Sequence, residues 1–130
     1  MLTISTDKNL LQLDIIHSFL TNSYWGKGRT IKQVQITIDN SLCFGVYLNK
    51  QQIGFGRVVT DYAVFAYLMD IFILPEHRGK GYSKKLMEAI INEPELKDCK
   101  TWMLKTSDAQ GLYKQFGFIE LQNPDIVMER

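Results

Sequence analysis

The sequence is poor in cysteine and histidine. Its only two cysteines, Cys43 and Cys99, lie far apart and form no CxxC pair. This argues against a disulfide-stapled scaffold and favours two reduced, buried thiols in a cytosolic protein. The two histidines, His17 and His77, are also far apart and have no carboxylate cluster beside them. The sequence therefore predicts no metal site.

Long hydrophobic runs and an excess of one charge are missing as well. No stretch approaches the roughly 20 apolar residues of a membrane span, and the start, MLTISTDKNLLQLDII, does not resemble a secretory signal. The formal net charge is +1, so nothing draws the whole chain to nucleic acid or to a membrane surface. We expect a cytoplasmic protein in which electrostatic recognition is local.

The composition that remains suits one folded domain. Hydrophobic residues make up 45% of the chain and charged residues 22%, which is typical of globular proteins. There is no low-complexity tract and no internal repeat, and 130 residues fit a single core. We therefore expect one domain over residues 1–130.

Changes in hydrophobic periodicity divide the chain into short elements. They predict a strand at 2–4, helices at 8–20 and 30–39, a β-hairpin around NKQQ, a strand at 65–74, a helix at 80–93, a strand at 101–106, a helix at 107–116, and last strands in GFIEL and IVMER. Gly54 and Gly56 inside the second hairpin strand indicate a bulge or a close backbone approach. The strand–helix–strand unit over 65–106 favours parallel pairing. The predicted fold class is α/β (α+β), a mixed sheet with helices on both faces.

The most informative stretch is DIFILPEHRGKGYSKKLMEAII, residues 70–91. A buried strand runs through a glycine-broken turn into a helix, whose first amides have no internal partner and carry partial positive charge. Gly79 and Gly81 remove side chains that would block those amides. Four basic side chains surround the same turn: Arg78, Lys80, Lys84 and Lys85. This favours a compact, multiply charged anion such as a pyrophosphate.

Two common nucleotide motifs do not fit this turn. A Walker A loop needs GKS or GKT, but Tyr82 and Ser83 follow Gly81, and the dinucleotide fingerprint GxGxxG needs a glycine where Lys84 stands. A solvated basic helix start is the plain structural alternative. A nucleic-acid-binding surface is another, but the basic cluster is small and the net charge near zero.

The order of apolar strand, proline, basic turn and helix resembles the GNAT superfamily of N-acetyltransferases. The family pattern of Arg or Gln, two residues, Gly, one residue, then Gly or Ala reads here as RGKGYS, with Ser83 at the last position. A second signature, DAQGLYKQFGF, resembles the family's helix that carries an alanine and a tyrosine and ends in Gly-Phe, through Ala109, Tyr113, Gly117 and Phe118. Thr106 stands where the family often has asparagine. The two signatures occur in the family's order.

The resemblance implies acetyl-CoA as co-substrate, no metal, and a mostly antiparallel sheet with one splayed parallel pair. The pantetheine arm would run along the backbone of Ile71, Phe72 and Ile73. The pyrophosphate would bind the turn formed by Arg78, Gly79, Lys80, Gly81, Tyr82 and Ser83. Thr106 and Ala109 would contribute further cofactor contacts.

Tyr113 matches the family tyrosine that protonates the leaving sulfur, a role that suits a group with an ordinary pKa of about 10. The alternative is a buried aromatic whose hydroxyl is bonded to backbone.

Asp70 lies in an otherwise apolar strand, where a carboxylate needs a partner. It is a candidate base for the amine, and the equal alternative is a structural role, in an ion pair with Arg57 or in a bond to a loop amide.

Tyr24 and Trp25 are candidate residues of an aromatic wall of the acceptor site, and a packing role in the core or in a lid is the alternative. Asp61 is a weaker candidate for the base at that site. The predicted activity is transfer of acetyl from acetyl-CoA to a primary amine of a small molecule or peptide, in a protein that can form a homodimer. A non-catalytic acyl-CoA-binding module is the alternative function.

Overall fold

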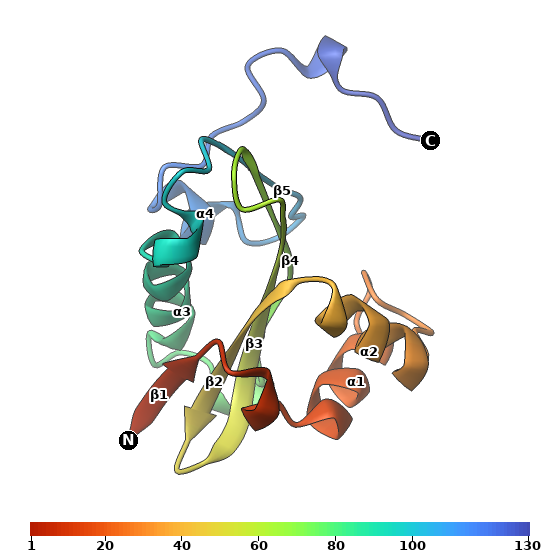
Figure 1. Cartoon of the computed structure of the whole chain (residues 1–130), viewed down its shortest axis with the longest axis vertical. Helices are drawn as coiled ribbons and strands as arrows, with labels where there is room; N and C mark the ends of the chain where they lie inside the picture. Colours follow the sequence, from red (N-terminus) through yellow and green to blue (C-terminus); the bar gives the residue numbers. More distant parts are fainter.

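A five-stranded sheet in the order β1-β2-β3-β4-β5 forms the centre of the computed structural model, which describes all 130 residues (Figure 1). The strands β1 to β4 pair with one another in antiparallel fashion, whereas β5 is parallel to β4. Their bounds are β1 Leu2–Ser5, β2 Leu42–Leu48, β3 Gln51–Thr60, β4 Phe65–Ile73 and β5 Thr101–Leu104. The predicted fold class, a mixed and mostly antiparallel sheet, is confirmed.

Helices cover both faces of this sheet, as predicted. α1 (Leu13–Thr21) and α2 (Ile31–Asp39) lie on one side, and α3 (Tyr82–Ile91) and α4 (Gln110–Lys114) on the other (Figure 1). Short 3-10 turns form at Lys8–Leu10, Pro75–His77, Pro94–Leu96 and Pro124–Ile126. No helix has both the length and the apolarity that a membrane crossing requires.

Two hydrophobic cores follow from this layering. The larger core packs Leu86, Met87 and Ile90 of α3 against one face of the sheet. The smaller packs Ile16, Leu20, Val34 and Ile38 of α1 and α2 against Phe55 and Phe72 on the other face. Helical spacing places each set on one stripe of its helix, so each helix buries one side and leaves the other in water.

A β-bulge at Asp70 changes the course of β4. Arg57 of β3 pairs with Met69, and Phe55 pairs with Phe72. Between these two pairs β4 therefore contains one more residue than β3. Asp70 takes up the extra residue in a left-handed conformation with φ 56°, which resembles the bulge class in which one residue is left-handed. The bulge also reverses the faces of the strand: Leu68 belongs to the larger core and Phe72 to the smaller.

The strand around Gly54 confirms the predicted close backbone approach. A Cβ atom at Gly54 would lie 2.9 Å from the backbone oxygen of Phe72 and 2.6 Å from the side chain of Ile73. No larger residue fits there without displacing β4, so Gly54 lets β3 and β4 lie close together just beyond the bulge.

Several predicted elements are shorter in the structure. The helix predicted at 8–20 begins only at Leu13, because Leu11 is extended and the side chain of Gln12 bonds to the backbone of Lys50 and Gln52 instead of lying on a helix. The helices predicted at 80–93 and 107–116 are present as the shorter α3 and α4. The strand predicted at 101–106 ends at Leu104. These differences lie at element ends, where local pattern is weakest.

The strands predicted in GFIEL and IVMER are wrong. Residues 118–130, called the tail below, contain a 3-10 turn but no strand, and they extend away from the body of the molecule (Figure 1). Phe118 packs on the larger core and its amide donates to Tyr113. Beyond Phe118 the backbone hydrogen bonds of the tail lie within residues 123–127. A strand needs a partner edge, and the tail pairs with none.

Candidate active site

A cleft opens where β4 and β5 separate. Their parallel pairing runs from Phe65 beside Thr101 to Leu68 beside Leu104 and then stops, one residue before the bulge begins to turn β4 away. The predicted splay of the parallel pair is therefore present, and it begins beside the bulge. The resulting cavity has a volume of about 580 Å³. Its lining comes from β4, β5, α4 and the loop after α1.

One edge of β4 faces this cleft with its backbone groups. The amide of Leu74 donates to the backbone oxygen of Ile53 in β3, so it points to the β3 edge. Amides along a strand point alternately to its two edges. The backbone groups of Ile71 and Ile73 therefore point toward the cleft. The only protein group that uses them in this structure is Arg78, whose Nε donates to the Ile73 oxygen at 2.9 Å.

The glycine turn lies at one end of the cleft. None of the backbone amides from Gly79 to Lys84 donates a hydrogen bond within the protein; the first helical amide with a partner is that of Lys85. Gly79 and Gly81 are both left-handed with φ 80°, and nothing lies within 4 Å of a Cβ atom placed on either. Consecutive amides of this kind form a concave site for an anion, and Arg78 and Ser83 connect it to the cleft lining.

Tyr113 enters the cleft from α4. Its side chain is buried, and its hydroxyl makes no hydrogen bond with the protein, so the alternative of a hydroxyl bonded to backbone is not what the structure shows. Burial, and then the charges of Asp108 and Tyr24, raise the pKa of Tyr113 to about 12. The hydroxyl thus keeps its proton at neutral pH and is free to donate it to a group in the cleft.

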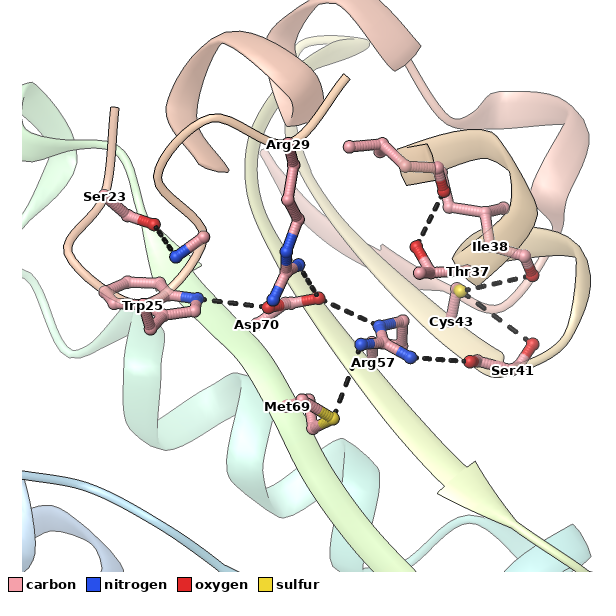
Figure 2. Close-up of polar contacts among 12 residues, drawn as sticks. Ser23, Trp25, Arg29, Thr37, Ile38, Ser41, Cys43, Arg57, Met69 and Asp70 are labelled. Carbon is pink, nitrogen blue, oxygen red and sulfur yellow. Dashed lines mark hydrogen bonds and ion pairs between the residues drawn. The ribbon is translucent and has the colours of Figure 1, made fainter. Parts of the chain in front are cut away.

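Asp70 lies at the centre of a buried polar network on the other side of the cleft (Figure 2). Its Oδ2 accepts from Arg29 at 2.8 Å and from Arg57 at 2.9 Å, and its Oδ1 accepts from Trp25 Nε1 at 3.0 Å. The Asp70 side chain is fully buried. The ion pair with Arg57, one of two alternatives in the sequence, is present, and both carboxylate oxygens are occupied.

The loop after α1 closes one side of the cleft. Trp25 packs edge-on against Tyr24, with ring centroids 5.0 Å apart. The Tyr24 hydroxyl accepts a hydrogen bond of 2.8 Å from Ser107, which follows β5. This contact joins two segments far apart in the chain across the mouth of the cleft. Arg29 and Ser107 are therefore site residues that the sequence analysis missed.

The remaining predicted site residues divide between the cleft and other places. The cleft lining includes Tyr24, Trp25, Asp70, Ile71, Phe72, Ile73, Arg78, Ser83, Thr106, Ala109 and Tyr113. The hydroxyl of Thr106 accepts the amide of Ala109 at the start of α4. Asp61 is not brought to the cleft: it is exposed in the β3–β4 turn, where it accepts three backbone amides that lower its pKa to about 2.

Comparisons with known proteins assign this fold to a family of acetyltransferases. Residues 39–120 match the family described as Acetyltransferase (GNAT) domain. A Gibberella zeae protein named as an acetyltransferase, FG08082, is 30% identical over 85% of this chain and 74% of its own length. Uncharacterized N-acetyltransferase ycf52 of Gracilaria tenuistipitata is 36% identical over 70% of this chain and 53% of its own.

Solved structures show the same fold. A GNAT-family protein from Xanthomonas campestris is 46% identical, with a TM-score of 0.97 over 100% of this chain and 92% of that one. An acetyltransferase from Clostridium acetobutylicum, solved with acetyl-CoA, has the same fold at 14% identity and a TM-score of 0.74, covering 100% of this chain and 96% of its own. The chain belongs to the GNAT acetyltransferase family.

Proposed function

We propose that this protein is an N-acetyltransferase that moves an acetyl group directly from acetyl-CoA to a primary amine of a small molecule or peptide. The observation that carries the proposal is the continuity of the cleft: unpaired amides at Gly79–Lys84, the cleft-facing backbone of Ile71 and Ile73, and a free tyrosine hydroxyl lie along one cavity. These are an anion site, a strand-like site for an amide-containing chain, and a proton donor.

The chain's residues fit acetyl-CoA in that order. The six amides and Arg78 would hold the pyrophosphate. The two amide groups of the pantetheine arm would pair with the cleft-facing backbone of Ile71 and Ile73, as an added strand pairs with a sheet edge. This pairing would bring the thioester near the bulge, between Tyr113 on α4 and the Asp70 network.

In the proposed reaction the amine nitrogen attacks the thioester carbonyl carbon. A C–N bond forms, the C–S bond breaks, and Tyr113 gives its proton to the departing sulfur, so free CoA leaves as a thiol. The proton released by the amine returns to Tyr113 through solvent. The Ile71 amide, which faces the cleft, is the proposed donor to the oxyanion.

Asp70 is assigned a positioning role, because both its oxygens are already bonded. It holds Trp25 and Arg29 at the acceptor side of the cleft. To act as the base that the sequence suggested, it would have to release a partner or work through water. A pH–rate profile of Asp70→Asn separates the two roles: a positioning role predicts an unchanged profile shape at lower kcat.

The proposal is tested by calorimetry and by thiol release. Titration with acetyl-CoA and with CoA should show saturable binding, and an amine library should contain acceptors that release free thiol. Tyr113→Phe should keep donor affinity while kcat falls by about 100-fold or more. No heat with either ligand on folded protein would refute the proposal, and binding without thiol release for any amine would favour the non-catalytic module.

A further inference from the structure

The buried network around Asp70 contains one more positive charge than negative charge. Arg29 and Arg57 both bond to the single carboxylate of Asp70, at 2.8 and 2.9 Å. An uncompensated charge in a largely buried cluster is costly, and an anion brought from outside would relieve that cost. The network therefore favours a negatively charged group wherever a molecule in the cleft can reach one of the two guanidinium groups.

Arg29 is the guanidinium group that the cleft makes accessible. The Arg57 side chain is 7% exposed, and each of its three nitrogens already has a partner in the protein. The Arg29 side chain is 20% exposed, lines the cleft and bonds only through Nη1 (Figure 2). Its Nε and Nη2 have no partner in the protein, and neither atom is closed off from solvent.

The two unpaired nitrogens of Arg29 match a carboxylate. The N–H bonds of Nε and Nη2 are parallel in the planar guanidinium group, so they can donate to both oxygens of one carboxylate. The backbone of Arg29 is held as well, because its amide donates to the oxygen of Gly26 and its own oxygen lies 3.0 Å from His17 Nε2. A carboxylate would therefore meet a donor pair that is already oriented.

The position of Arg29 limits how far such a carboxylate can lie from the reacting amine. Its Nη1 is 2.8 Å from Asp70, and the next residue of β4 is Ile71, whose amide is the proposed donor to the oxyanion. Successive strand residues advance by only about 3.3 Å. The carboxylate and the attacking nitrogen should thus be a few atoms apart. A free amino acid meets this condition, whereas the first residue of a peptide does not, because its carboxylate has become an amide.

Aromatic rings line the cleft together with Arg29. Trp25 is 38% exposed and Tyr24 63%, and the two rings pack edge to face. Their polar atoms are engaged, since Trp25 Nε1 donates to Asp70 and the Tyr24 hydroxyl accepts from Ser107. The two residues therefore offer mainly ring surface to the rest of an acceptor, which suits an apolar side chain.

We propose that the acceptor is a free α-amino acid with an apolar side chain, whose carboxylate binds Nε and Nη2 of Arg29 while its amine attacks the thioester. This inference rests on the proposed acetyl transfer and names the acceptor of that reaction. The C–N bond forms, the C–S bond breaks, the amine proton passes to solvent, and an N-acetyl amino acid and free CoA leave. Arg29 determines specificity, because it binds a part of the acceptor in which no bond changes.

The test compares two probes that differ only at the carboxylate, L-phenylalanine and L-phenylalaninamide, by thiol release at saturating acetyl-CoA. Wild type should have a kcat/KM at least about 10-fold higher for L-phenylalanine, the effect expected of a charged hydrogen bond. Amine basicity works against this result, because the amide has the less basic amine and more of it is unprotonated at neutral pH. A preference for the acid would therefore report on the carboxylate.

Two variants assign the preference to Arg29. Arg29→Gln removes the charge but keeps a donor for Asp70, so kcat/KM for L-phenylalanine should fall by about 10- to 100-fold, and that for the amide much less. Lys27→Gln is the matched control: it removes the same charge from the same loop, but Lys27 is exposed and does not line the cleft. The ratio between the two probes should remain as in wild type. Circular dichroism checks that both variants are folded.

Calorimetry provides a measurement that needs no variant. N-acetyl-L-phenylalanine should bind to CoA-loaded wild-type protein at least about 10-fold more tightly than N-acetyl-L-phenylalaninamide, since only the former has a carboxylate for Arg29. Equal affinities would overturn the inference even if Arg29→Gln did not fold.

The outcomes separate this inference from the proposed function. Thiol release with equal kcat/KM for the two probes would overturn the amino-acid acceptor and leave acetyl transfer standing. A probe ratio that persists in folded Arg29→Gln, or that disappears in Lys27→Gln, would overturn the role of Arg29. No thiol release with any amine would refute the proposed function, and this inference with it.

Discussion

Replacing Asp70 by asparagine should destabilise the protein strongly, because it removes the only negative charge from a buried cluster of two guanidinium groups. The Asp70 side chain is fully buried, Arg57 is 7% exposed and Arg29 20%. Asparagine keeps the shape and one acceptor oxygen, and it tolerates the left-handed backbone that Asp70 adopts. The substitution therefore isolates the charge from the effects of shape and backbone.

Breaking a buried ion pair by removing one partner costs about 3–5 kcal/mol. With a urea m-value of about 2 kcal/mol per M, the unfolding midpoint should fall by about 2 M. Asp70→Ala should lose about 1–2 kcal/mol more, since alanine pays for the left-handed conformation. Urea unfolding followed by circular dichroism measures all three proteins under the same conditions.

The ion pair between Lys105 and Glu129, which lies outside the Asp70 network, provides the control. Lys105 and Glu129 are mostly exposed, so Glu129→Gln should leave the urea midpoint unchanged within error. If Asp70→Asn unfolds within about 1 kcal/mol of wild type, the network is not the stabilising unit described above, and its role in positioning Trp25 and Arg29 loses its physical basis.

Three further predictions follow from single positions. Gly81→Ala should weaken acetyl-CoA binding about 10-fold or more, since alanine disfavours φ 80° and covers the turn amides, whereas Gly111→Ala, with nothing within 4 Å, should leave titration unchanged. Burial raises the pKa of Cys43 to about 11, so a thiol reagent at pH 8 should modify Cys43 only after unfolding. The pKa of Asp61 is lowered to about 2, so Asp61→Ala should destabilise the protein above pH 4, and the difference from wild type should disappear as pH falls through 2.

The features that the sequence predicts well are those that depend on neighbours along the chain. Strand and helix types follow from periodicity, and the open amides at Gly79–Lys84 follow from two glycines before a helix. Arg29 and Ser107 could not be found this way, because their bonds to Asp70 and Tyr24 cross 41 and 83 residues of sequence. Nothing local distinguishes Arg29 from any other basic residue in a loop.

The tail shows a different limit of local pattern. GFIEL and IVMER have the composition of strands. Composition indicates that a segment suits a paired, half-buried surface, but it does not indicate whether a partner strand is present. The helix predicted at 8–20 is present but begins only at Leu13, since the side chain of Gln12 makes hydrogen bonds to the β2–β3 hairpin.

The extra residue at Asp70 also fixes the length of β4. In the part of β4 before Asp70, the even-numbered side chains face α3. In the part after Asp70, the odd-numbered side chains, such as Ile71 and Ile73, face α3. Deleting or inserting a single residue between Leu68 and Phe72 would shift this parity and turn the second half of the strand inside out. A change of one β4 side chain disturbs the packing at one place, whereas a change in the number of residues through the bend disturbs every position after it.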